Sequence, residues 1–126
     1  MAKTQNSKRF DLEDRTFLFA ENVRIFIKKQ IKNISNIEDG KQLIRASGSV
    51  AANYIEANES ISKKDFIYRI KICRKEAKES RLFIRLIDTN NKAAYEKERD
   101  ELIQEATELM KIFGSILVKS EKTKTI

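Results

Sequence analysis

Five basic residues recur at helical spacing in the second half of the chain and could bind a row of phosphates. They are Lys71, Arg74, Lys78, Arg81 and Arg85. Spacings of three and four residues keep them within an arc of about 80° on a helix that turns about 100° per residue. Such a row releases counterions when it meets a phosphate backbone, so it is a candidate nucleic-acid-binding surface whose affinity depends on salt.

The same row also has two structural interpretations. Glu101, Glu105 and Glu108 form an acidic row on a later predicted helix, which could neutralise the cations within one subunit or across to a neighbour. A solvated face with a few local ion pairs is the other interpretation. Aromatic residues do not decide between them, because Tyr68 alone lies near the basic side, and a single ring is not a base-stacking platform.

Carboxylate pairs are the remaining candidates for chemistry. Glu76 with Glu79, or Asp100 with Glu105, could in principle transfer protons or hold Mg²⁺. The chain has no His, which excludes Ser-His-Asp and Cys-His sites and the usual zinc and di-iron ligand sets. Nothing in the sequence places the carboxylates in a cleft, so we expect no catalytic residue, no metal, no cofactor and no enzyme activity.

Composition favours one helical domain. The 126 residues are 40% apolar and 36% charged, with a net charge of +7, no Pro and three Gly, which disfavours a sheet with many tight turns. Cys73 is the one cysteine, which suits a reducing compartment. Because no apolar run approaches the roughly 20 residues that cross a bilayer, we expect a cytoplasmic protein with no membrane partner.

The apolar periodicity predicts an all-α, antiparallel up-down-up-down four-helix bundle over residues 1–126. The ends, at about 1–10 and 119–126, are expected to be flexible tails. We expect helices at about 11–34, 41–57, 62–88 and 94–118, with a loop at 33–40. The last two helices should each bury one apolar stripe, consisting of Phe66, Ile70, Cys73, Ala77, Ile84 and Ile87 on the third and of Tyr95, Leu102, Ala106, Leu109, Phe113 and Leu117 on the fourth. The third helix should begin at Ser62, because Ser62 and Asp65 match a capping-box pattern.

The first predicted helix carries more apolar residues than one neighbour can cover. One stripe runs along the helix as Phe17, Ala20, Val23, Ile27, Ile31 and Ile34. The surplus outside this stripe would leave an exposed apolar patch, which usually marks a protein interface. The candidate oligomer interface is Leu18, Phe19, Ile25 and Phe26.

The stretch QLIRASGSVAANYIEANESISKKDFIYRIKICRKEAKES resembles the bacterial four-helix-bundle family that includes the 23S rRNA intervening-sequence proteins. The likeness also covers DLEDRTFLFAENVRIF, and so most of residues 10–88. The resemblance implies an antiparallel bundle that forms a homopentameric ring. Similar bundles are basic accessory subunits of reverse transcriptases in diversity-generating retroelements, so it also implies nucleic-acid and polymerase partners.

The family motif falls on the second predicted helix, at Gln42, Arg45, Ser49, Asn53 and Glu56. A frequent family Gly is replaced here by Ala57, which puts a left-handed helix cap there in doubt. A polar row among small residues must be hydrogen-bonded if it is buried. We therefore expect a polar network of Glu56, Asn53 and an Arg, within the subunit or across a ring interface.

Two functions remain open from the sequence. The first is a non-enzymatic homo-oligomer, expected to be a pentamer, that binds RNA or DNA electrostatically. The alternative is a structural or adaptor ring that binds a protein partner such as a polymerase, with its cations consumed in salt bridges.

Overall fold

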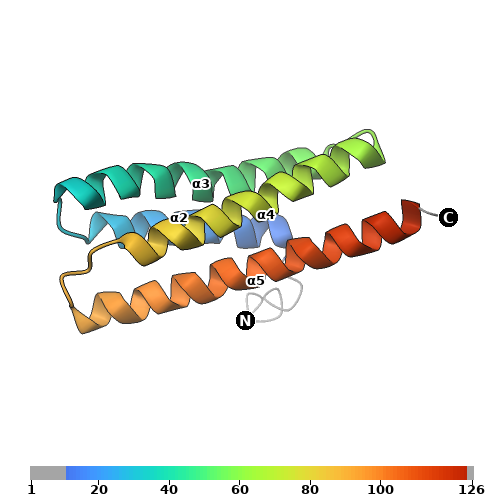
Figure 1. The fold of residues 1–126 in the computed structure, drawn as a ribbon. Coiled ribbons are helices and arrows are strands. Elements are labelled where there is room, and N and C mark those ends of the chain that lie inside the picture. Colours follow the sequence, from blue (N-terminus) through green and yellow to red (C-terminus); the bar gives the residue numbers. More distant parts are fainter. Residues whose placement is uncertain (1–10, 125–126) are drawn as a thin grey trace, which may run out of the picture.

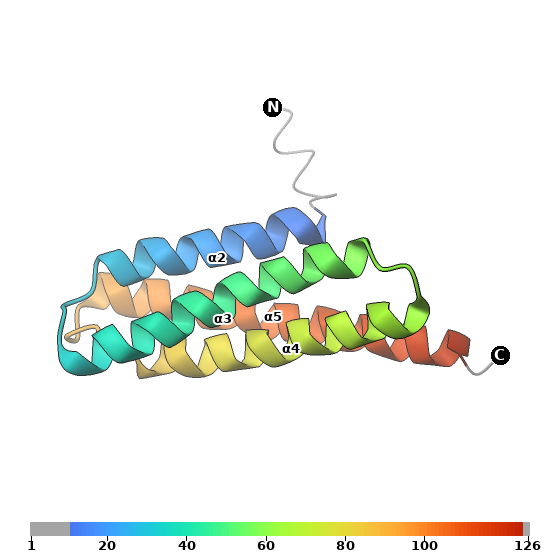
Figure 2. The same ribbon diagram turned by 90° about the horizontal axis from the view of Figure 1, so that it is seen from above.

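The computed structural model describes residues 11–124, which form four helices and no strand. Their bounds are α2 (Leu12–Lys28), α3 (Ile34–Asn58), α4 (Lys63–Leu86) and α5 (Ala93–Lys124). Each helix runs back alongside the one before it (Figures 1 and 2). α2 packs against α3 and α5, and α4 packs against the same two helices from the other side. The predicted all-α bundle of four helices is confirmed.

Three helices begin with a side-chain cap. The side chains of Asp11, Asn33 and Ser62 accept a hydrogen bond from the backbone N–H three residues on, at 2.9, 2.8 and 3.0 Å. Each bond satisfies one of the backbone donors that a helix start leaves free. The predicted start of the third helix at Ser62 is therefore confirmed.

The predicted loop at 33–40 is wrong, because these residues form the cap and first turns of α3. α2 ends at Lys28, and the connection is short. Asn33 caps α3, and Gly40, which was taken as a loop residue, lies inside that helix. A Cβ on Gly40 would lie 3.6 Å from Ile27 of α2, an ordinary van der Waals distance, so this position faces α2 without a close approach that requires glycine.

A buried asparagine fixes this connection to the loop between α4 and α5. The Nδ2 of Asn36 donates to the carbonyl oxygens of Ile31, at 3.0 Å, and Asp88, at 2.8 Å. Its Oδ1 accepts from the backbone N–H of Asp88 at 2.8 Å. One side chain thus satisfies backbone groups of both loops at this end of the bundle.

The core draws on both apolar seams of α2, because Ala20 and Val23 of the predicted stripe are buried together with residues from the surplus. Phe19 and Phe26 are fully buried, whereas Phe17, assigned from the sequence to the buried stripe, is 58% exposed. Phe19 and Phe26 therefore cannot form an exposed interface, and that part of the predicted oligomer surface is wrong. The rest of the core follows the predicted stripes of the last two helices, with Ile70, Cys73, Ala77, Ile84, Ile87, Leu102, Ala106, Leu109, Phe113 and Leu117 buried.

The C-terminal helix is longer than predicted. α5 continues to Lys124, so the part of the expected flexible tail from 119 to 124 is helical. Its last turns project beyond the start of α2, which is much shorter (Figure 2). The tail expected at 1–10 lies outside the described residues. None of the four described helices combines the length and the apolar character needed to cross a membrane.

Candidate nucleic-acid interface

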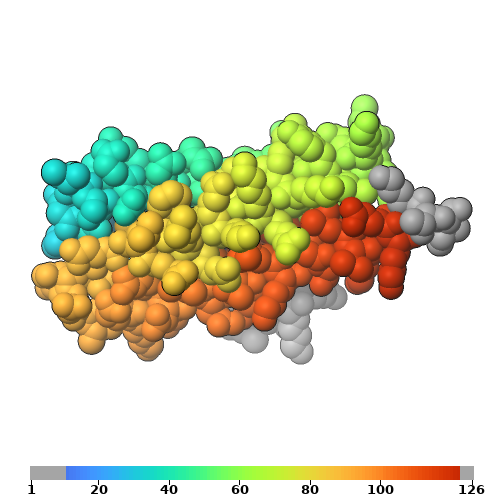
Figure 3. Space-filling model, viewed as in Figure 1, coloured from blue at the N-terminus to red at the C-terminus, as the bar shows by residue number. Residues whose placement is uncertain are grey.

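α4 lies open to solvent between α3 and α5 (Figure 3). Its outward side carries the five predicted cations and two more lysines. We call these seven residues the α4 cationic face: Lys64, Lys71, Arg74, Lys75, Lys78, Arg81 and Arg85. All are exposed except Arg81, which is half-buried. The structure thus brings the predicted basic row together on one accessible surface.

The acidic residues of α4 lie to one side of the predicted cationic row. Asp65, Glu76 and Glu79 lie at least about 80° around the helix from the five predicted cations, on the side that packs against α3. Arg45 of α3 neutralises two of them, with its Nη2 at 3.4 Å from Glu76 and 3.1 Å from Glu79. The α4 cationic face therefore keeps its charge, because α3 supplies the counter-charge for these acids.

Three members of the predicted row have no partner among the described residues. Arg74, Lys78 and Arg85 make no hydrogen bond or ion pair within residues 11–124. Lys71 makes a long ion pair with Glu121 at 4.0 Å, and Arg81 donates to the hydroxyl of Thr107 at 3.1 Å. Most of the positive charge is therefore available to a ligand.

The predicted acidic row on α5 does not neutralise these cations within the subunit. Glu105 and Glu108 both bind Arg15 of α2, each at 2.7 Å. The bond to Glu105 raises the pKa of Arg15. Hydrogen bonds from Gln104 and then Arg15 lower the pKa of Glu108. The third acid of the row, Glu101, is exposed and has no ion pair within residues 11–124.

The surface of α4 is hollowed between its side chains. A depression of about 440 Å³ is lined by Lys75, Lys78, Glu79, Arg81, Leu82 and Arg85. The exposed Leu82 lies within this otherwise charged lining. The depression gives phosphate oxygens access to several cations at once, and Arg45 neutralises Glu79, the one acid in its lining.

The family-motif residues form two separate polar contacts. Asn53 donates to the backbone oxygen and hydroxyl of Ser49, both at 3.0 Å, and accepts from Arg69 of α4 at 3.0 Å. Arg45 forms the second contact with Glu76 and Glu79.

The remaining motif residues join neither contact. Gln42 and Glu56 are exposed, so the expected Glu56–Asn53–Arg network lacks Glu56. Ala57 stays helical, without the left-handed cap of the family pattern.

Sequence reasoning did not single out Arg69. The residue lies on the α3 side of α4, where it completes the contact with Asn53 across the helix pair. Its Nε is buried without a hydrogen bond within the described residues. The sequence held no signal for this role, because the partner of Arg69 is set by how α4 packs on α3.

The outer side of α2 keeps an apolar surface. Leu18 and Ile25 of the predicted interface are 38% and 44% exposed, and Phe17 joins them. At 100° per residue all three fall on the side of α2 away from the core. An exposed apolar strip on an outer helix is typical of a protein interface.

Three of the four carboxylates considered for catalysis form ion pairs with arginine. Glu76 and Glu79 share Arg45, and Glu105 binds Arg15, while Asp100 is exposed. Burial raises the pKa of the Cys73 thiol to about 12, so the thiolate is scarce at neutral pH. Within the described residues, no three His, Cys, Asp or Glu side chains are grouped to hold a metal ion.

These features define an all-α four-helix bundle with a cationic outer face on one helix. The profile of the 23S rRNA-intervening sequence protein family matches residues 8–115, and the chain belongs to this family. A similar solved structure is a protein of unknown function from the S23 ribosomal protein family of Bacteroides thetaiotaomicron VPI-5482. The two sequences are 25% identical, and the two structures superpose with a TM-score of 0.69. The match covers 85% of this chain and 98% of the Bacteroides chain. No curated protein matches the sequence.

Proposed function

We propose that this protein is a non-enzymatic, homo-oligomeric nucleic-acid-binding protein whose α4 cationic face contacts the phosphate backbone of RNA or DNA. The observation that carries the proposal is the separation of charge on α4. Its acids face α3, while Arg74, Lys78 and Arg85 face solvent without a partner among the described residues. Cations held on one helix face raise the local potential and attract a polyanion.

The arrangement suits backbone contact rather than the reading of base sequence. The row from Lys71 to Arg85 spans about 20 Å along the helix, at a rise of about 1.5 Å per residue. A rigid row of point charges and guanidinium groups binds phosphates at several positions. The binding is therefore expected to be insensitive to sequence and steeply dependent on salt.

The proposed oligomer would use the outer side of α2. Phe17, Leu18 and Ile25 supply the apolar surface, and the family resemblance implies a ring of five subunits. A heterologous contact whose rotation closes produces such a ring. A ring presents several α4 cationic faces to one nucleic acid, which raises the avidity without new contacts.

A charge-removal variant tests the proposal. In Arg74→Gln/Lys78→Gln/Arg85→Gln, we expect weaker binding of every sequence tested. The slope of log K against log salt should become shallower by about 2.7 for a duplex and about 2.1 for a single strand. The purified protein is first treated with nuclease. Fluorescence anisotropy across a salt series then measures the binding affinity and its salt slope.

The matched control removes the same charge elsewhere. Lys28→Gln/Lys32→Gln/Lys97→Gln changes exposed lysines outside α4. If both triple variants bind with the same affinity and slope as the unchanged protein, α4 is not the binding site. Equal losses in both would indicate a response to net charge alone.

The exposed apolar strip on α2 favours a second candidate, an adaptor ring that binds a protein partner such as a polymerase. Light-scattering mass of the nuclease-treated protein, with and without RNA, separates the two candidates. A defined oligomer that takes up no RNA or DNA even at low salt supports the adaptor. Uptake at low salt with release as salt rises supports nucleic-acid binding.

A further inference from the structure

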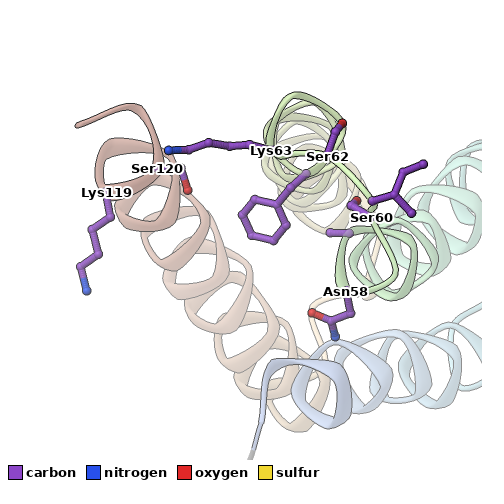
Figure 4. Close-up of a pocket in the computed structure, with 9 residues that line it drawn as sticks. Asn58, Ser60, Ser62, Lys63, Lys119 and Ser120 are labelled. Carbon is purple, nitrogen blue, oxygen red and sulfur yellow. The ribbon is translucent and has the colours of Figure 1, made fainter. Parts of the chain in front are cut away.

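A cavity of about 550 Å³ lies at the end of the bundle where α4 begins and α5 ends (Figure 4). Three segments line it: the end of α3 with the turn after it, the first turn of α4, and the last turns of α5. The volume is within the range of small-molecule sites, about 300–1,000 Å³, but the cavity is wide open to solvent on one side. The cavity forms where α5 runs past the shorter α2.

The lining combines an aromatic ring, hydroxyl groups and a cation. Phe66 was predicted to be core, but it is only half-buried and lines the cavity. The Ser62 hydroxyl accepts the cap bond from Asp65, and Ser120 makes no hydrogen bond among the described residues. The Ser62 oxygen points away from α5 (Figure 4), so the hydroxyl of Ser120 is the one available to a ligand between the two helices.

Lys63 connects this cavity to the α4 cationic face. Its side chain extends across towards Ser120 of α5, whereas Lys119 points away (Figure 4). At 100° per residue, Lys63 lies at the same angle around α4 as Arg81, so it continues the cationic row towards the cavity. A strand whose phosphates follow that row reaches the cavity at its end.

We propose that the cavity holds one unpaired nucleotide at the end of a nucleic acid that lies along the α4 cationic face. The base packs on Phe66, its phosphate lies at Lys63, and the hydroxyl of Ser120 binds a polar edge of the nucleotide. The inference rests on the proposed function, because the α4 face must first bind the backbone. One ring is too few to stack a run of bases, but one ring beside a cation is enough for the single base that this cavity would hold.

The test compares three labelled duplexes that differ only in their ends. One is blunt, one carries three unpaired nucleotides at each 3′ end, and one carries them at each 5′ end. The unchanged protein should bind the better overhang about 5- to 150-fold more tightly than the blunt duplex, the range that stacking of one base supplies. Anisotropy at one fixed salt concentration measures the ratio.

Two variants locate the effect. Phe66→Leu removes the ring but keeps an apolar side chain, and Ser120→Leu fills the cavity from α5. Both should lose the gain from the overhang and keep the affinity for the blunt duplex. The control Ser115→Leu changes an exposed residue on the same helix and should keep the gain. Circular dichroism and thermal unfolding check that each variant folds.

The outcomes separate the two proposals. If the blunt duplex binds and the overhang adds nothing, or if the gain survives in both cavity variants, the nucleotide site is overturned while backbone binding stands. If none of the three duplexes binds at low salt, the proposed function itself fails.

Discussion

Replacing Arg45 by Met should destabilise the bundle, because Arg45 supplies the counter-charge for the acids of α4. The side chain of Glu76 is only 9% exposed, and its carboxylate lies 3.4 Å from Arg45. Methionine keeps much of the aliphatic length of arginine and removes the charge. The change therefore tests the electrostatic role of this family-motif residue more than its packing.

The expected loss follows from the burial of the two partners. Removing the partner of a fully buried charge costs about 3–5 kcal/mol, and an exposed pair contributes about 0–1 kcal/mol. Arg45 is 51% exposed and Glu76 is nearly buried, so this pair lies between these limits. We expect Arg45→Met to lower the free energy of unfolding by about 1–3 kcal/mol.

A double-mutant cycle in urea measures the coupling. In a Glu76→Gln background the carboxylate is absent, so Arg45→Met should cost about 1 kcal/mol less than in the unchanged protein. The control Lys41→Met breaks an exposed pair with Glu38 and should cost less than about 0.5 kcal/mol. The same cost for Arg45→Met in both backgrounds, at constant m-value, would refute the argument.

Two further predictions concern the loops and acid stability. Asn36→Ala removes three hydrogen bonds to the backbone of both loops and should cost about 2–4 kcal/mol in urea, at about 1 kcal/mol per bond. Ser35→Ala is its exposed control, and an equal small loss in both would show that Asn36 does not hold the loops together. The pKa of Glu108 is lowered from 4.5 on folding, so its contribution to stability is present above pH 4.5 and is lost as pH falls below it. Thermal unfolding of Glu108→Gln should therefore show a shallower loss below pH 4.5 than the unchanged protein, and a curve parallel to the unchanged one would contradict the assignment.

The fold was predictable because most helices carry one strong apolar stripe. The stripes of α4 and α5 were predicted almost residue for residue, and Ser62 marked a helix start. α2 was different, because two apolar seams run along it and periodicity does not decide between them. Only the packing against α3 and α5 shows that Phe19 is core and Phe17 is not.

The candidate site was predictable only in part. The spacing of the five cations on α4 was sufficient to place them on one face. Whether that face was neutralised depended on distant partners, since Arg15 binds the acids of α5 and Arg45 binds those of α4. Gly40 misled the loop assignment, because a glycine inside a helix looks the same in sequence as one that ends a helix.

The unequal lengths of α2 and α5 determine where the molecule opens first. The last turns of α5 pack beside the start of α4 but project beyond α2, so fewer neighbours hold their backbone hydrogen bonds in place (Figure 2). Segments with few buried neighbours exchange amide hydrogens by local fraying at a lower free energy than global unfolding. Amide protection at Ser120 is therefore a direct reporter on this end of the bundle, and a ligand in the adjoining cavity should slow exchange there while the centre of α5 is unchanged.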